Sequence, residues 1–554
     1  MSRTFNLVDD RWIPCVKGDG GVEPEGILHT LADAEQYVEV RDPSPLVTVA
    51  LHRLLLAILH RVFGTESPEA WADLWQNGAG RFDQRKLEAY LKSPVIHPRF
   101  NLFDERHPFY QTASLPLGPV DKKTGRPKFV KPIWQMAHEL AYSDNMNLFA
   151  HFTESDWETR PAAEAARWLV AFQGFALGGL ITTEEGRKAQ DGSADAGQLV
   201  KSAVVLAKGE NLFQTLMLNM VHYSADDEAP FAFKAKADRP AWERDDEQQL
   251  KRHEFDRRYD GYLDLLTWQS RRVKLVAERG PEGNLLGVSG VVSMKGFQLP
   301  GNYWRRNYET MVGYIRARDA KGRQDPWPPL GFRSGRDLWR DSHALFQTIA
   351  EDCQRSRSID WLNELRQAGH LSRKQLQLDV SGMSADRAKI FFWRQESLPL
   401  PLAYLDKPEL VESLKQALSL ADSVASEALR PSAWAAVANW MTAIPEMKPD
   451  TDRVRDVVDS FAPERIYWPQ LERPFRKLLV DLAADGADLG DLIGRWYWDS
   501  LHSAARDAFD DSIGRIDGGR DLKAVNAGRG LLLSRLKKIR NDHHIPNREK
   551  ERAT

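Results

Sequence analysis

The stretch LQLDVSGMSADRAKIFFWRQESLPLP, residues 376–401, predicts a β-hairpin with a charged tip. Residues 376–380 alternate apolar with polar side chains, Ser381 and Gly382 lead into a small polar turn, and residues 389–393 are rich in β-formers. Closely spaced prolines end the segment. We therefore expect strands near 376–381 and 388–394, with Ile390 and Phe392 facing inward. The tip is expected to hold Asp386, Arg387, Ala388 and Lys389.

The bulk composition is that of a globular protein with more than one domain. A chain of 554 residues is too long for one core, and 42% hydrophobic with 28% charged residues is ordinary for a soluble protein. The only cysteines, Cys15 and Cys353, have no metal or redox spacing, which favours a reducing compartment. The N-terminus has no signal-peptide pattern, and no apolar run approaches the length of a membrane span. These features predict a cytoplasmic protein.

The charge is spread unevenly along the chain. Residues 251–400 carry 26 Lys and Arg against 18 Asp and Glu, a net +8, which leaves −11 for the rest of a chain of net charge −3. A basic region on an acidic body suits a nucleic-acid contact made inside a larger assembly. Ordinary solvated surface explains the same numbers equally well.

The helical signals divide the chain in two, with fold class α+β. Residues 44–63 predict an amphipathic helix whose histidines, His52 and His60, are expected to be solvated, and residues 161–180 predict another that ends near Gly178–Gly179. Short strands dominate residues 265–400, where Trp268 and Trp393, like Trp339, are expected in the core. Predicted helices at 404–430, 431–446, 463–484, 487–509 and 520–541 have short connections. We predict a mixed α/β domain over 1–402 and an antiparallel helical bundle over 403–554.

No catalytic constellation stands out in the sequence. It has no phosphate-binding loop, GxSxG or HExxH pattern. Asp542, His543 and His544 are adjacent near the C-terminus and could suggest a metal-dependent nuclease, but no matching ligands lie near them. The HPFYQ segment, residues 107–111, is more typical of a packed histidine than of an acid–base site. The expectation is a protein without catalytic residues, cofactor or metal.

Seven short segments carry a resemblance to a known family. In chain order they are FNLVDDRWIPC, HPFYQT, GENLFQTLMLNMV, DRPAWERD, LDLLTWQSRRVKL, GRDLWRDSHAL and SADRAKIFFWRQESLPLP. Together with the helical C-terminus, they resemble the large subunit, called CasA, of the type I-E CRISPR surveillance complex Cascade. The resemblance covers nearly the whole chain.

The resemblance implies a function in target recognition. Large subunits of this family recognise the protospacer-adjacent motif (PAM) in duplex DNA, help open the duplex to start an R-loop, and help recruit the helicase-nuclease. The implied partners are crRNA, double-stranded target DNA, the backbone and small subunits, the subunit that holds the crRNA 5′ handle, and the helicase-nuclease. No membrane partner is implied. The 1–402 domain would contact the crRNA end and read the PAM.

The resemblance also assigns candidate residues. The family's wedge falls on the predicted hairpin tip, with Arg387 where a glutamine is usual. The basic finger falls on residues 314–324 and the residues Arg316, Arg318 and Lys321. The glycine loop is assigned to Gly178 and Gly179, with Gly192 and Gly197 as further candidates. The contact with the crRNA end and neighbouring subunits is assigned to Asn145, Asn147 and Phe149. The paired cysteines with which some members hold zinc are missing here.

Two alternatives to a PAM-reading subunit stay open at this point. One is a metal-dependent nuclease that uses the C-terminal histidines. The other is a purely structural subunit that does not discriminate between DNA sequences.

Overall fold

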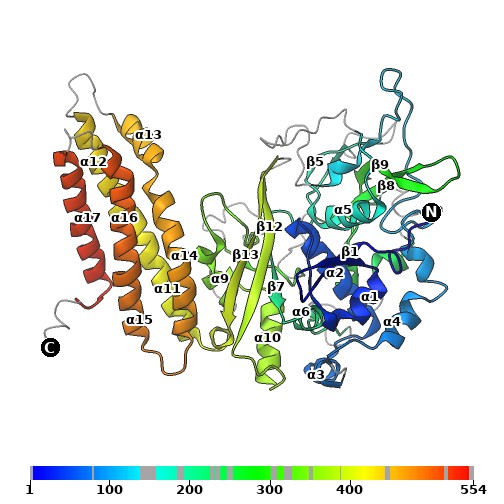
Figure 1. The fold of residues 1–554 in the computed structure, drawn as a ribbon, viewed down its shortest axis with the longest axis horizontal. Helices are drawn as coiled ribbons and strands as arrows, with labels where there is room; N and C mark the ends of the chain where they lie inside the picture. Colours follow the sequence, from blue (N-terminus) through cyan, green and yellow to red (C-terminus); the bar gives the residue numbers. More distant parts are fainter. Residues whose placement is uncertain are drawn as a thin grey trace. The chain divides into compact units, whose positions relative to one another are not determined.

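The computed structural model divides the chain into two compact units (Figure 1). It describes residues 4–77, 80–137, 157–183, 192–224, 230, 238–245, 254–300, 308–316, 327–347, 353–386, 389–442, 450–516 and 522–547. Unit 1 comprises Met1–Ser334 and Thr348–Ser397, and unit 2 comprises Gly335–Gln347 and Leu398–Thr554. The boundary between the units therefore lies between residues 397 and 398, whereas the sequence predicts it between 402 and 403. Unit 2 also includes the earlier segment 335–347.

Unit 1 combines small antiparallel sheets with short helices. Its three-stranded sheets have the orders β2-β1-β3, β13-β12-β7 and β4-β9-β8, and two further pairs are β10-β11 and β5-β6. The second sheet consists of β7 (Ala203–Lys208), β12 (Gln375–Asp386) and β13 (Lys389–Pro401), and the paired strands are β5 (Gly179–Leu180), β6 (Ser193–Ala194), β10 (Tyr314–Ile315) and β11 (Cys353–Gln354). The strands of the first sheet are β1 (Ile13–Lys17), β2 (Val22–Glu25) and β3 (Tyr37–Val40). Those of the third are β4 (Lys131–Pro132), β8 (Arg271–Arg279) and β9 (Leu285–Lys295). The described helices of unit 1 include α1 (Ile27–Ala32), α2 (Pro45–Val62), α3 (Pro68–Asn77), α4 (Gln84–Leu91), α5 (Ala162–Phe175), α6 (Leu212–Asn219), α8 (Tyr262–Leu266) and α10 (Arg357–Gln367).

Helix α2 is the central helix of unit 1. The Ser44 side chain accepts a hydrogen bond from the Val47 amide, and a proline occupies the first turn, so the N-terminus is capped. The helix contacts α5, α6, α8 and strand β12. Among the described residues, α2 is the one helix long and apolar enough to cross a membrane by length and composition, and 89% of it is buried inside the structure.

The expectation that His52 and His60 are solvated is wrong. Both are at most 2% exposed, because neighbouring elements pack around more of α2 than the face that periodicity predicts. The His52 ring nitrogen Nδ1 lies 2.8 Å from the Thr48 carbonyl oxygen, and the His60 ring packs edge-on against Tyr223 and Tyr262. Burial lowers the pKa of His52 to about 4 and that of His60 to about 3.

Residues 398–554 of unit 2 form a helical bundle, drawn yellow to red in Figure 1, and its earlier segment holds the short helix α9, drawn green. Its helices are α9 (His343–Phe346), α11 (Pro408–Ser423), α12 (Arg430–Thr442), α13 (Thr451–Phe461), α14 (Pro463–Leu482), α15 (Leu489–Arg495), α16 (His502–Ile513) and α17 (Leu522–Asp542). Single π-helical turns join α11 to α12 and α15 to α16. Helix α17 packs on α12, and α14 packs on α16. The predicted α+β fold with a C-terminal helical bundle is confirmed, although α13 was not among the predicted helices.

The early segment of unit 2 belongs there because of its aromatic packing. The Trp339 ring lies 4.6 Å from the Phe475 ring and 6.0 Å from the Trp468 ring, measured between centroids. The Arg340 guanidinium lies 3.3 Å from the Trp468 ring centroid and donates to Asp422 at 2.7 Å. These contacts join residues that are far apart in the sequence.

Candidate nucleic-acid interface

The predicted hairpin consists of β12 (Gln375–Asp386) and β13 (Lys389–Pro401). The strands are hydrogen-bonded neighbours, and a connection of two residues can join only antiparallel strands. Arg387 and Ala388 form that connection and lie outside the described residues, whereas Asp386 and Lys389 are the described residues on either side. The hairpin is confirmed, and its strands are longer than predicted.

Gly382 lies inside β12, beyond the predicted end of the strand at residue 381. Gly382 pairs with Ala203 of β7 (Ala203–Lys208), and a Cβ atom on it would lie 2.1 Å from the Ser202 carbonyl oxygen. The glycine therefore permits a close approach between two backbones. The sequence alone predicts that the strand ends just before this glycine, because the partner strand β7 is remote in the chain.

The base of the hairpin is fixed to the body of unit 1. Strand β12 pairs with β7 from Gln377 to Gly382, and the side chains of Leu378 and Val380 are fully buried. The Asp379 carboxylate accepts hydrogen bonds from Gln395 (3.1 Å) and Ser397 on β13, which link the two strands. The tip is thus carried on a three-stranded sheet.

The outer part of β13 exposes aromatic side chains. Phe391 is 64% exposed and Trp393 is 40% exposed, whereas Ile390 and Phe392 are half-buried. The expectation that Trp393 is a core residue is therefore wrong, because it lies on the solvent-facing side of an edge strand. The same expectation is confirmed for Trp268 and Trp339.

The glycine candidates lie in a small loop that follows α5. Helix α5 ends at Phe175, earlier than expected, and Gly179 begins strand β5 (Gly179–Leu180), which pairs with β6 (Ser193–Ala194). Gly179 is exposed, and its φ of +135° is one that favours glycine. The end of α5 is displaced because the chain leaves the helix in an extended conformation at Ala176.

The other glycine candidates differ in what surrounds them. A Cβ atom on Gly178 would lie 2.8 Å from the Ala196 amide nitrogen, and one on Gly197 would lie 2.5 Å from the Gly174 carbonyl oxygen. Gly178 therefore allows the loop to pack on itself, and Gly197 allows it to pack on the last turn of α5. Gly192 has open space apart from Thr183, at 3.8 Å.

The segment predicted as the basic finger begins and ends beside β7. Arg316 directly follows β10 (Tyr314–Ile315), and Arg318 and Lys321 lie outside the described residues. Tyr314 forms an antiparallel bridge with Pro329, so the chain leaves and returns at one place. On β7, the Val205 amide donates to Met311 and the Ala203 amide donates to Leu330.

Strand β7 therefore joins two of the three elements that the resemblance assigned, the hairpin and the finger segment. It lies between β12 and the two flanks of the finger segment, and the glycine loop precedes it in the chain. Lys201, in a left-handed conformation with φ +63°, places its ammonium 3.6 Å from the Asp386 carboxylate at the hairpin tip. Sequence reasoning missed Lys201 because its position depends on the register between β7 and β12.

Other candidates have less structural support. Asn145, Asn147 and Phe149 lie outside the described residues. His543 and His544 follow the end of α17, and no group of three His, Cys, Asp or Glu among the described residues could hold a metal ion. Cys15 and Cys353 are buried free thiols, and burial raises the pKa of Cys15 to about 12.

Comparisons with known proteins identify the family. The family model of CRISPR-associated protein Cse1 matches residues 6–508. The CRISPR-associated protein CasA/Cse1 of Thermus thermophilus is 30% identical over 549 residues, which cover 96% of this chain and 98% of that protein.

Solved structures agree with this match. The crystal structure of Thermus thermophilus CasA has a TM-score of 0.75 at 27% identity and covers 96% of this chain and 99% of its own. A chain of a CRISPR RNA-guided surveillance complex has the same fold, with a TM-score of 0.71 at 18% identity over 96% of this chain and 99% of its own. The chain therefore belongs to the CRISPR-associated Cse1 (CasA) family, the large subunits of type I-E CRISPR surveillance complexes.

Proposed function

We propose that this subunit reads the PAM in duplex DNA and wedges the strands apart so that crRNA can pair with the target. The observation that carries the proposal is the attachment of the hairpin and the finger segment to β7, directly after the glycine loop. A family whose solved relatives include a chain of an RNA-guided surveillance complex supports the same role.

The hairpin is suited to opening a duplex because its base is fixed by the pairing of β12 with β7 and by the burial of Leu378 and Val380. Unstacking base pairs costs a few kcal/mol per step, and contacts between protein and DNA must offset this cost. A tip that could bend would be pushed aside by the stacked bases instead of separating them. Arg387 would be inserted beneath the last PAM pair, where its planar guanidinium can stack. Lys201 offsets the charge of Asp386, which would otherwise repel phosphates at the tip.

The finger and the glycine loop would read the minor groove. Lys321 would reach base acceptors there, with Arg316 and Arg318 on phosphates, and the minor-groove pattern permits a degenerate motif. Of the four glycines, Gly179 is the best candidate for backbone contact with DNA because it is exposed. Gly178 and Gly197 would shape the loop, and Gly192 has room for a partner.

The remaining parts of the proposal concern partners. Residues 141–152, with Asn145, Asn147 and Phe149, would contact the crRNA end and its neighbouring subunits. The helical bundle would contact the small subunits, and the subunit would help to recruit the helicase-nuclease. In this proposal the chain performs no catalysis itself and acts in the cytoplasm.

The test uses the assembled complex and two target duplexes. Arg387→Glu and Lys321→Glu should each weaken binding to an intact duplex with the PAM by at least about tenfold. Arg387→Glu should weaken binding to a duplex with a pre-opened bubble much less, because the wedge is then not needed. Arg81→Glu, an exposed arginine outside the three elements, is the matched control.

The outcomes separate the three functions. Unchanged binding by both variants would leave only a structural role. Cleavage of DNA by the pure chain with Mg²⁺ or Mn²⁺, abolished by His543→Ala and His544→Ala, would instead establish a nuclease.

A further inference from the structure

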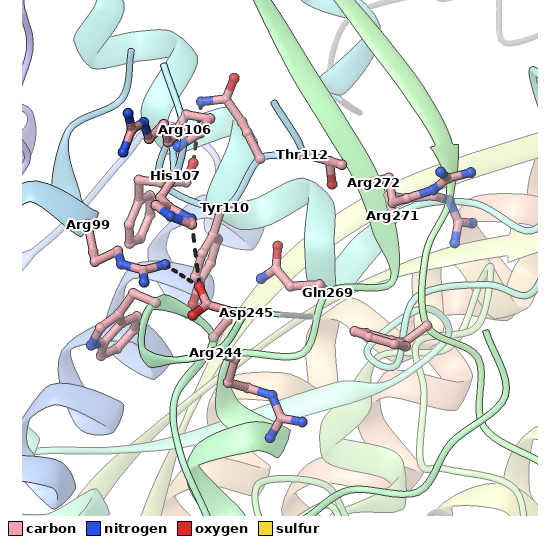
Figure 2. Close-up of a pocket in the computed structure, with 16 residues that line it drawn as sticks. Arg99, Arg106, His107, Tyr110, Thr112, Arg244, Asp245, Gln269, Arg271 and Arg272 are labelled. Carbon is pink, nitrogen blue, oxygen red and sulfur yellow. Dashed lines mark hydrogen bonds and ion pairs between the residues drawn. The ribbon is translucent and has the colours of Figure 1, made fainter. Parts of the chain in front are cut away.

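Unit 1 contains a cationic cavity that the PAM-reading elements do not use. Its volume is about 530 Å³, within the range of small-molecule sites. Three segments supply most of its lining: residues 106–112, which include the HPFYQ motif, residues 241–245, and residues 269–272 at the start of β8. Figure 2 shows Arg99 and His107 converging on Asp245, with Arg271 and Arg272 across the cavity.

The described lining is strongly positive. Five arginines line the cavity against a single carboxylate among its described residues. The arginines are Arg99, Arg106, Arg244, Arg271 and Arg272. Arg244 also has a carboxylate partner outside the lining, Asp260, at 2.6 Å.

Arg271 contributes a buried charge that no described carboxylate neutralises by direct contact. The residue is 3% exposed, and among the described residues its guanidinium donates to the backbone carbonyl oxygens of Ser270, Leu177 and Asp195, at 2.7–2.8 Å. Burial lowers its pKa to about 10, so the side chain is still protonated at neutral pH. The charge of Asp195 opposes this lowering of the pKa, but the hydrogen bonds that the structure describes for the guanidinium all go to carbonyl oxygens. A buried cation held in this way favours an anion in the adjoining cavity.

Asp245 marks the position where such an anion can be held. Its carboxylate oxygen lies 2.8 Å from the Arg99 guanidinium and 3.7 Å from His107 Nδ1, while its side chain is 69% exposed. The arginine hydrogen bond keeps the pKa of Asp245 below its usual value. A phosphate has the charge and acceptor oxygens to replace this carboxylate.

The apolar part of the lining is mainly aromatic, with Pro108 and Ala241 beside the rings. Phe109 and Tyr110 are stacked, with ring centroids 4.2 Å apart, and Trp242 and Phe297 also line the cavity. Tyr110 has a φ of +55°, a strained conformation for a residue with a side chain. A ligand that combines a phosphate with a flat aromatic base matches these two kinds of lining.

We propose that this cavity binds one phosphorylated nucleotide, with the phosphate on Arg99 and His107 and the base toward the aromatic lining. A double helix is too wide for a cavity of this volume, so the ligand is a free nucleotide or the terminal nucleotide of a single strand. The site does not depend on the hairpin, the finger or the glycine loop being DNA contacts.

The experiment measures binding of nucleotides to the full-length wild-type chain by titration calorimetry at low salt. The probes are AMP, inorganic phosphate, and tetranucleotides of RNA and DNA with either a 5′-phosphate or a 5′-hydroxyl. A 5′-phosphorylated tetranucleotide should bind at least about tenfold more tightly than its hydroxyl counterpart. AMP binding as tightly as the tetranucleotides indicates a free nucleotide, and weaker AMP binding indicates a strand end.

Two variants test the assigned residues in opposite directions. Arg99→Gln should weaken binding about tenfold by removing one charged contact. Asp245→Asn should strengthen binding severalfold, because it removes the carboxylate that competes with the phosphate. A purely structural role for the Arg99–Asp245 pair would not give opposite effects.

The controls carry the same chemical changes elsewhere in unit 1. Arg81→Gln removes an exposed arginine outside the lining, and Glu158→Gln removes an exposed carboxylate that pairs with Arg160 at 2.7 Å. Both substitutions should change the affinity for the nucleotide probes less than about twofold, because exposed charges and exposed ion pairs contribute little. The proposal is overturned if the wild-type chain binds no phosphorylated probe, if Arg99→Gln and Arg81→Gln weaken binding equally, or if Asp245→Asn does not strengthen it. None of these results bears on PAM recognition, which is measured with duplex DNA and the assembled complex.

Discussion

The His60 ring is neutral inside unit 1 because burial lowers its pKa to about 3. The imidazole pKa in an unfolded chain is about 6.5, so the unfolded state takes up the proton first as the pH falls. The free energy of unfolding of unit 1 should therefore decrease between about pH 6.5 and pH 4. His52, with a pKa of about 4, acts in the same direction.

The variant His60→Phe tests this pH dependence. Phenylalanine keeps a ring at the site and cannot be protonated, so the loss of stability between pH 7 and pH 5 should become smaller. Urea midpoints at the two pH values measure the effect, and His29→Phe, at an exposed position, is the control. An unchanged pH dependence in His60→Phe would contradict the assignment.

Arg53 and Glu309 form a buried ion pair within unit 1. Their side chains are 3% and 5% exposed, and two hydrogen bonds of 2.8 and 3.2 Å join them. Glu309→Leu leaves the guanidinium buried without its partner and should lower the free energy of unfolding by about 3–5 kcal/mol. Adding Arg53→Met should restore most of that loss in urea denaturation. A double variant no more stable than Glu309→Leu would show that the charge pairing is not the cause.

At the scale of single elements, the pairing of β12 with β7 depends on one glycine. A methyl group on Gly382 would meet the Ser202 carbonyl oxygen at 2.1 Å, so Gly382→Ala should force the strands apart. We expect a loss of about 2–4 kcal/mol in unit 1, measured by urea denaturation, together with weaker target-duplex binding by the assembled complex.

A second glycine provides the comparison for Gly382. Gly18 lies in a turn, has no positive φ, and a methyl group added to it would meet nothing within 4 Å, so Gly18→Ala should change stability little. Equal effects of the two substitutions would mean that the close approach of the β12 and β7 backbones is not the reason why residue 382 must be a glycine.

Local patterns predict the elements whose partners are near in the chain. The hairpin at 376–401 follows from alternation, a small polar turn and a run of β-formers, and helix α2 follows from its spacing of leucines. Patterns cannot predict how many sides of an element are covered. For this reason α2 was expected to have a solvated face, and Trp393 was expected in the core.

The candidate site was predictable in its parts and not in its arrangement. Motif resemblance assigned the hairpin tip, the finger and the glycine loop separately. The attachment of the hairpin and the finger segment to β7, and the ion pair between Lys201 and Asp386, depend on strand register between distant segments. The cationic cavity was missed for the same reason, because three separate segments supply most of its arginines.

At the scale of the whole molecule, we expect the stability of each unit to depend on its own hydrophobic core. Trp339 is 1% exposed and packs against Phe475 and Trp468, so Trp339→Ala should lower the stability of unit 2 by about 3–5 kcal/mol. Trp361, fully buried in unit 1, is the matched residue, and Trp361→Ala should lower the stability of unit 1.

Scanning calorimetry of the full-length chain distinguishes the two variants. We expect each substitution to shift a different part of the unfolding profile. The same shift from both variants would show that the chain unfolds as one cooperative body.

The membership of residues 335–347 in unit 2 affects how truncated chains behave. A chain that stops after Ser397 keeps Leu338, Trp339 and Phe346 but lacks the aromatic side chains that cover Trp339. Such a fragment should self-associate through these residues even if the rest of unit 1 is intact. Loss of DNA binding after removal of the C-terminal helices would then report aggregation rather than a role of those helices in recognition.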